Sequence, residues 1–262
     1  MKGTPANEKL FWDSRARNYP LPFDPGNAVK TRRIVRLLGR MGVRFRKKKL
    51  LDIGCGTGVY ALPLAASASG VLGVDSSRAM LAVYGRQCRE RGIKNAACAL
   101  SAWDEMPGAA VKGKFDIALA SMTMAVKTRA DVLKMEAAAG TCVYIGWDGV
   151  RKNELLEKVY RAHGLEYKAP DGAPRILKIL RALGRRFTVK RIRDSWEKTT
   201  LPQEALREIE MNMKVNGARL KREEVKKMLA KRTRNGRVRQ RTTVRKALIV
   251  WEPPKKAAKK VL

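Results

Sequence analysis

Asp52 begins the segment whose residue types and spacing say most about chemistry. From this residue the sequence is Asp52-Ile53-Gly54-Cys55-Gly56-Thr57-Gly58. Glycine has no Cβ, so a turn with a glycine at every second position lets the backbone lie directly against a ligand. Asp75 follows 21 residues after Gly54, about the separation at which a second acid meets ribose hydroxyls in dinucleotide-type folds. The pattern indicates a nucleoside-bearing ligand, and the alternative is a tight turn that holds none.

Strand and helix signals alternate around this turn, and they define the elements that must position it. Short apolar runs predict strands at 49–53, 70–75, 96–100, 115–121 and 141–146. Helical patterns lie at 57–69, 76–91 and 129–139, the second with Ser76 or Ser77 as its N-cap. Such alternation predicts a parallel sheet with helices on both faces.

The pattern changes in the second half of the chain. Helices are expected at 154–163 and 174–184, and an alternating strand at 187–200. Residues 201–232 contain one or two amphipathic helices with a break at Asn216-Gly217. A final strand is expected at 239–251, buried over 247–251. The last two strands would complete the sheet, with the helices between them as an insertion.

The segment from Asp52 to Gly58 closely resembles the D-x-G-x-G-x-G signature of class I S-adenosylmethionine-dependent methyltransferases, and the small-molecule group in particular. The resemblance extends over about residues 11–147. It implies a Rossmann-like α/β fold with a seven-stranded, mostly parallel sheet and a helical insertion between the last two strands. It also implies an enzyme that uses S-adenosyl-L-methionine, whose positively charged methionine end suits an acid such as Asp52.

The resemblance implies a role for each residue of the motif. Asp52 and the glycine turn would hold the methionine part, and Asp75 both ribose hydroxyls. Met80 would pack against the adenine or against the helix behind it. The implied cofactor-binding residues are Tyr19, Asp52, Gly54, Cys55, Gly56, Thr57, Gly58, Asp75, Ser76, Met80, Ala102, Trp103 and Ser121.

The chain departs from the family pattern after the third predicted strand. The acid that usually contacts the adenine amino group falls on Ala102. Ser101 or Asp104 would substitute for it, and the backbone of Trp103 would still contact the adenine.

The segment from Phe11 to Tyr19 contains W-D-x-x-A-x-x-Y, which resembles the lid of many small-molecule methyltransferases. The resemblance implies that it folds over the cofactor, with Tyr19 near the methionine end. The alternative is an amphipathic helix docked on the sheet. We therefore expect a helical lid segment at 1–44, a cofactor-binding core at 45–150, a substrate-side half at 151–251 and a disordered basic tail at 252–262.

No catalytic residue is predicted, because a neutral leaving group needs alignment of the nucleophile more than acid–base help. The fourth strand ends in Ala120-Ser121-Met122-Thr123-Met124, without the N/D-P-P-Y/F tetrapeptide of amino-group methylation and without a carboxylate. Ser121 or Thr123 would orient a substrate or cap the next helix. Two further groups are candidates for the acceptor side: Tyr144, Trp147 and Asp148 as an aromatic wall or core packing, and residues 194–198 as a roof.

The net charge of +33 attracts polyanions and leaves two hypotheses for the acceptor. We favour a small molecule, with the charge as general surface character. The alternative is RNA, held by its phosphates; a cofactor-binding protein without turnover is a third hypothesis. The candidate phosphate contacts are Arg44, Arg46, Lys47, Lys48, Lys49, Arg185, Arg186, Lys190, Arg191, Arg193, Lys231, Arg232, Arg234, Arg237, Arg239 and Arg241.

The remaining composition narrows the class of protein further. Four cysteines without a C-x-x-C pair and a single histidine, His163, predict buried thiols in a reducing cytoplasm and no metal site. No apolar run is long enough for a transmembrane helix, and the N-terminus has no secretory h-region. A membrane partner is therefore not expected, and the oligomeric state is open.

Overall fold

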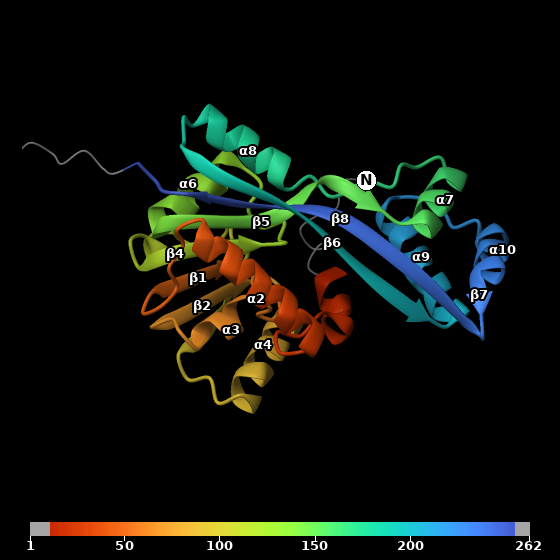
Figure 1. Ribbon diagram of the computed structural model, residues 1–262, viewed down its shortest axis with the longest axis horizontal. Helices are drawn as coiled ribbons and strands as arrows, with labels where there is room; N and C mark the ends of the chain where they lie inside the picture. Colours follow the sequence, from red (N-terminus) through yellow and green to blue (C-terminus); the bar gives the residue numbers. More distant parts are fainter. Residues whose placement is uncertain (1–10, 255–262) are drawn as a thin grey trace, which may run out of the picture. The chain divides into compact units, whose positions relative to one another are not determined.

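Residues 11–254 are described by the structure, which is a computed structural model (Figure 1). Within them one sheet has the strand order β3-β2-β1-β4-β5-β8-β6, and β7 pairs with β8. The strands are β1 (Lys49–Ile53), β2 (Gly70–Asp75), β3 (Ala96–Leu100), β4 (Phe115–Ser121), β5 (Ala139–Lys152), β6 (Phe187–Thr200), β7 (Thr233–Arg234) and β8 (Arg237–Trp251).

The sheet is mostly parallel. The pairs β1–β2, β1–β4, β2–β3 and β4–β5 are parallel, while Figure 1 shows β8 running opposite to β5 and β6. The predicted α/β class is therefore confirmed. The sheet has one strand more than predicted among the described residues, because the two-residue β7 forms an antiparallel pair with the start of β8.

The helices connect the strands as predicted, including an insertion between β6 and β8. They are η1 (Ala16–Asn18), α2 (Pro25–Arg40), α3 (Ala61–Ala65), α4 (Arg78–Glu90), α5 (Gly108–Val111), α6 (Arg129–Ala138), α7 (Glu154–Ala162), α8 (Ala173–Ala182), α9 (Pro202–Val215) and α10 (Arg222–Arg232). Of the two predicted caps of α4, Ser77 is the N-cap, since its side chain accepts a bond from the Met80 amide at 3.1 Å.

The largest differences from the predicted bounds are in the first helix after the turn and in β5. The helix expected from residue 57 begins only at Ala61, because Gly58 has a φ of +83°, which no right-handed helix accommodates. Strand β5 was expected to end at residue 146 and continues to Lys152.

The chain divides into two compact units. One contains residues 11–146, 172–190 and 247–254 of the described chain. Its core joins Leu51 and Ile53 of β1 to Ile176 of α8 and Trp251 of β8. The Trp251 indole donates to Glu136 at 3.0 Å, and Arg185 pairs with the same carboxylate at 2.9 Å.

The other unit contains residues 147–171 and 191–246. Side chains of α7, α9 and α10 pack on Val238 of β8 to form its core. His163, at the end of α7, forms hydrogen bonds to two elements of this unit. Its Nδ1 donates to the Val159 carbonyl of α7 (2.7 Å), and its Nε2 accepts from the amide of Lys221, the residue before α10 (2.9 Å). A carbonyl only accepts and an amide only donates, so in this pair of bonds Nδ1 carries the proton and Nε2 is the acceptor.

No helix within residues 11–254 is both long and apolar enough to cross a bilayer. Residues 1–10 of the predicted lid segment and residues 255–262 of the predicted basic tail lie outside the described part of the chain. The predicted boundaries of the lid, core and substrate side stay predictions, as does the cytoplasmic location.

Candidate cofactor site

The glycine turn follows β1 at the carboxyl edge of the parallel strands. The amides of Gly54 and Cys55 both donate to the Val74 carbonyl of β2, at 2.7 and 3.1 Å. Gly54, Gly56 and Gly58 all have positive φ, at 66°, 53° and 83°. This backbone is favourable for glycine alone, so the motif is required for the turn to form.

The three glycines differ in what surrounds them. A Cβ on Gly54 would lie 2.0 Å from the Thr123 hydroxyl, and a Cβ on Gly58 would lie 2.7 Å from Leu62 and 2.8 Å from Tyr84. A Cβ on Gly56 would meet only the Tyr19 ring, at 3.7 Å. Gly54 and Gly58 therefore permit close packing, whereas Gly56 borders open space beneath Tyr19.

Asp52 is 1% exposed and lies just before the turn. Within the described part of the chain, neither of its carboxylate oxygens has a hydrogen-bond partner. Burial, and then the negative charge of Asp75, raise its pKa well above the usual range. A buried acid without a partner is costly, so this position fits a ligand that brings a cationic group.

Asp75 ends β2 and is held by backbone donors from the turn and from α4. Its Oδ2 accepts from the Gly56 amide at 2.8 Å, and its Oδ1 accepts from the Ser77 amide at 2.9 Å. Burial raises its pKa, and these amide bonds oppose the shift. A carboxylate accepts about four hydrogen bonds, so each oxygen keeps capacity for a ribose hydroxyl.

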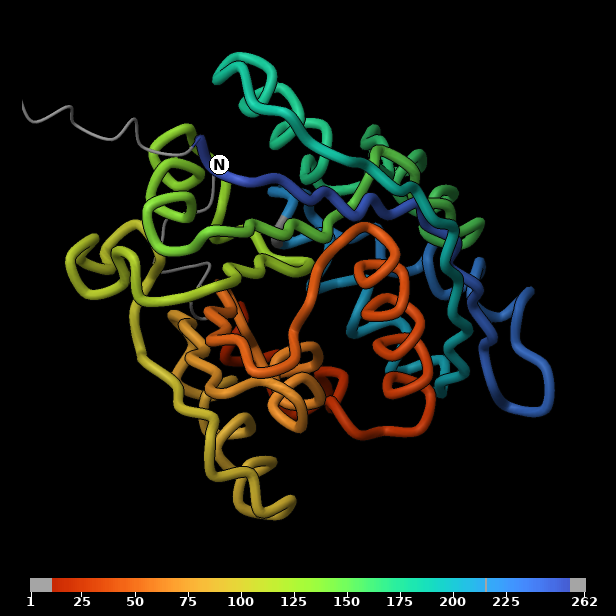
Figure 2. Tube along the Cα trace, turned by 60° about the vertical axis from the view of Figure 1, so that its left-hand side comes forward, coloured from red at the N-terminus to blue at the C-terminus, as the bar shows by residue number. Residues whose placement is uncertain are grey.

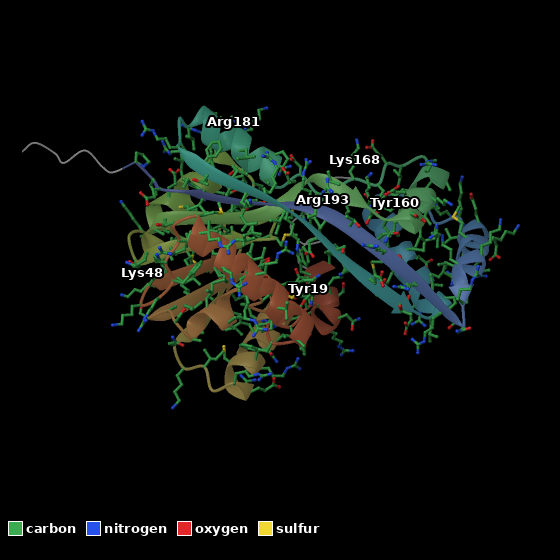
Figure 3. The ribbon with its side chains drawn as sticks, in the orientation of Figure 1. Tyr19, Lys48, Tyr160, Lys168, Arg181 and Arg193 are labelled. Atoms are coloured by element: carbon green, nitrogen blue, oxygen red, sulfur yellow. The ribbon has the colours of Figure 1, made fainter. Side chains whose placement is uncertain are left out.

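The N-terminal segment covers the turn at three points. Asp13 accepts from the Ser77 hydroxyl at 2.5 Å and from the Ala79 amide at 3.2 Å, at the start of α4. Thr57 donates to the Pro20 carbonyl at 2.7 Å. Tyr19 lies beside Gly56, and burial, together with the charge of Asp75, raises its pKa. Figure 2 shows this red segment beside the orange turn, and Figure 3 labels Tyr19.

The residues predicted to contact the adenine have mixed placements. Met80 is 2% exposed and lies on the buried face of α4. The Trp103 ring is buried, and its indole donates to the Asp131 carbonyl at 3.3 Å, while the Trp103 carbonyl accepts from the Lys134 ammonium at 2.6 Å. Ala102 is half-buried in the same loop, which the Ser101 amide ties to the Asp75 carbonyl at 3.0 Å.

The end of β4 contains a strained residue that the sequence did not reveal. Met122 has a φ of +51°, and its amide donates to the Ile145 carbonyl of β5 at 2.6 Å. Thr123 accepts from the Ala125 amide at 3.0 Å, and α6 is capped by Thr128 instead. Thr123 therefore does not cap the next helix, while Ser121 is half-buried at the strand end.

The residues predicted for an aromatic wall do not form one group. Tyr144 is 2% exposed in the core. The Trp147 ring lies 6.3 Å from Trp196, in the unit of residues 147–171 and 191–246. Asp148 pairs with Arg191 at 3.0 Å and Arg245 at 2.6 Å.

Several candidate phosphate contacts are already engaged in ion pairs. Arg185 binds Glu136 through two nitrogens, each at 2.9 Å. Arg232 pairs with Glu154 at 3.0 Å, and Arg239 pairs with Glu197. Lys48 pairs with Asp116 at 3.0 Å. Arg185 is 18% exposed, and its guanidinium pairs with the same Glu136 carboxylate that accepts from the Trp251 indole, so its role as a phosphate contact stays a prediction.

Sequence reasoning identified the turn, Asp52, Asp75 and Tyr19, which the structure brings together. It did not identify Asp13, whose partners Ser77 and Ala79 lie more than sixty positions away. The W-D pair of the lid segment was the available signal, but only the fold shows what the carboxylate binds.

Comparisons with known proteins agree with this geometry. Residues 50–141 match a family model described as a methyltransferase domain, whose members use S-adenosylmethionine. No curated protein gives a significant match. The fold is shared with several solved structures at low sequence identity. They include the [4+2]-cyclase SpnF (TM-score 0.56, 16% identity, 96% of this chain and 97% of that one), the BH2331 protein of Bacillus halodurans (0.52, 14%, 83% and 97%) and the YcgJ protein of Bacillus subtilis (0.51, 17%, 82% and 97%).

Proposed function

We propose that this chain, whose residues 50–141 match a methyltransferase-domain model, binds S-adenosyl-L-methionine at the glycine turn and transfers a methyl group to a small-molecule nucleophile. The observation that carries the proposal is Asp52, a fully buried carboxylate without a partner among the described residues. A cationic amino acid group on the ligand would complete it.

The residues around the turn bind different parts of the cofactor. Asp52 and the amides of the turn hold the methionine part, and Asp75 holds the ribose hydroxyls. Tyr19 covers Gly56 and excludes water from the same place. When bound, the cofactor supplies a methyl group on a sulfonium, an activated centre whose leaving group is neutral. The chain then has to align the acceptor with this centre. Such alignment alone removes a large part of the barrier to a bimolecular reaction.

The proposal of a small acceptor rests on the segment around Tyr19. Asp13 and the Pro20 carbonyl anchor that segment to α4 and to the turn, as expected of a lid over a small site. Ser121 and the strained Met122 stand at the carboxyl end of β4, where α/β folds bind their substrates. Backbone strain is typical of functional positions.

Calorimetry with S-adenosylhomocysteine and with NAD tests the cofactor. We expect binding of the former only, and loss of binding in Gly56→Val. Gly92→Val is the matched control, because Gly92 has a similar φ of +61° with open space around it but lies outside the turn. Binding of NAD without S-adenosylhomocysteine, or equal losses in both variants, would contradict the proposal.

Labelled cofactor tests the acceptor. The protein is incubated with it and with separated small-molecule and RNA fractions of a cell extract. We expect label in the small-molecule fraction. Label in the RNA fraction alone would show that the acceptor is RNA, and label in neither fraction would favour a binding protein without turnover.

A further inference from the structure

The unit of residues 147–171 and 191–246 contains a cavity of about 420 Å³ with a basic lining. Its cationic residues are Lys152 at the end of β5, Arg232 of α10, and Arg239 and Arg241 of β8. The acidic residues that line it are Glu154 and Glu157. Glu154 already pairs with Arg232 at 3.0 Å, and Glu157 accepts from the Asn153 amide at 2.9 Å. The four cationic residues outnumber the two acidic ones, so the lining has a net positive charge.

A row of arginines on β8 borders this cavity, and two of them, Arg239 and Arg241, line it. Arg237, Arg239 and Arg241 alternate along β8 with buried or half-buried residues, and all three are exposed. Alternate residues of a strand point to the same face and are separated by about 6.7 Å. The row thus carries three positive charges over about 13 Å, close to the spacing of successive phosphates along a nucleic-acid strand.

The charges of this row are available to a ligand. Arg237 and Arg241 have no ion pair among residues 11–254. Arg239 pairs with Glu197, but the two side chains are 72% and 42% exposed. Pairs this exposed contribute little to stability and are screened by salt, so a phosphate would compete for the guanidinium. Arg193 extends from the neighbouring strand β6, with its side chain exposed (Figure 3).

We propose that this row and the cavity beside it bind the phosphate backbone of a single-stranded nucleic acid. A linear row of charges suits a linear polyanion, whereas a compact phosphate needs donors that converge on one point. The residues that line the cavity include no aromatic ring, so binding is to the backbone without base stacking and is independent of sequence. This inference goes beyond the proposed function, since the bound strand need not be the methyl acceptor.

The test must separate a site from the attraction of a chain with net charge +33. A short fluorescein-labelled single-stranded RNA is titrated with the full chain at several salt concentrations, and anisotropy gives the Kd. The variant is R237Q/R241Q, and the matched control is R32Q/R36Q. Arg32 and Arg36 are exposed on α2 and have no ion pair among the described residues, so both variants lose the same charge.

We expect R237Q/R241Q to weaken binding about tenfold at physiological salt and to lower the slope of log Kd against log salt by about 1.4, since each single-strand phosphate contact contributes about 0.7. The control should change the slope by less than half as much. Both variants should still bind S-adenosylhomocysteine as the wild type does, which separates this test from that of the cofactor site.

Two outcomes would overturn the proposal. Equal losses in the two variants would mean that net charge alone attracts the RNA. Displacement of the RNA by inorganic orthophosphate at the same total phosphate concentration would mean that the cavity takes a compact phosphate. If R237Q/R241Q does not fold, as judged by circular dichroism, Lys152→Gln with Arg241→Gln gives the same comparison.

Discussion

Asp52 is a residue that favours ligand binding and at the same time lowers the stability of the ligand-free protein. Its carboxyl group is fully buried, and burial together with Asp75 raises its pKa well above the usual range. The folded protein therefore binds a proton here that the unfolded chain has already lost above about pH 4. Stability falls as the pH rises from that value through the folded-state pKa, because the unfolded state binds fewer protons. A cationic ligand removes this penalty by pairing with the carboxylate.

Replacing the acid tests this opposition. We expect Asp52→Asn to stabilise the ligand-free protein at neutral pH by about 1 kcal/mol, as is common when a strained functional residue is removed. The same variant should lose its affinity for S-adenosylhomocysteine. Thermal unfolding with and without this ligand measures both effects. A variant that melts lower than the wild type, or that is still stabilised by the ligand, would show that Asp52 has a structural partner instead.

The individual residues of the site show where prediction from sequence ends. The spacing of Gly54, Gly56 and Gly58 predicted a turn against a ligand, and all three have positive φ. Only Gly56 borders open space, however. Gly54 is required because Thr123 lies against it, and a contact between residues so far apart in sequence has no local signal. The backbone of Trp103 was predicted to contact the adenine, which stays a prediction; the burial of its ring in the core had no local signal.

At the scale of elements, the N-terminal segment is fastened to the start of α4. Asp13 accepts hydrogen bonds from the Ser77 hydroxyl and from the Ala79 amide. The Ser77 amide in turn donates to Asp75. The position also favours an acid, because the N-terminus of a helix carries partial positive charge. The fastening of the N-terminal segment and the orientation of Asp75 therefore both depend on Ser77.

Limited proteolysis tests this fastening. We expect Asp13→Ala to be cut by trypsin after Arg15 and Arg17, both exposed, at least several times faster than the wild type, and to bind S-adenosylhomocysteine less tightly. Ser14→Ala is the control, since Ser14 bonds only locally, to the Phe11 carbonyl at 2.7 Å. Equal cleavage of the two variants would show that Asp13 does not hold the segment.

The strands were predicted better than the places where they end. The bounds of β1, β2, β3 and β4 agree with the apolar runs. For the central strands β1 and β4 the reason is that buried parallel strands have continuous hydrophobic sequences. Strand β5 continues into Trp147–Lys152, where half of the residues are charged. Pairing with β8, far along the chain, sustains this extension, and a local pattern cannot report such pairing.

At the scale of the whole molecule, charge works against compactness. The chain has 57 basic and 24 acidic residues, and their mutual repulsion destabilises the folded state. We expect the melting temperature to rise by about 2–4 °C when added salt screens about 1 kcal/mol of this repulsion. Sodium and potassium chloride should act alike at equal ionic strength. A melting temperature that falls with salt would show that the ion pairs outweigh the repulsion.

The division into units was beyond local sequence patterns. A substrate-side half was expected at 151–251, and this boundary stays a prediction. Boundaries between the compact units fall within β5, β6 and β8. Residues 172–190 therefore belong to the same unit as residues 11–146. Such a division depends on long-range contacts, which leave no change in local composition.

The two hydrogen bonds of the His163 ring have a consequence for how the molecule can be observed. It is the one histidine in the sequence, and its two nitrogens link the end of α7 to the residue before α10. The resonance of its Nδ1 proton would therefore report on these helices without any introduced label. Its exchange rate with solvent would follow the opening of that helical layer in real time.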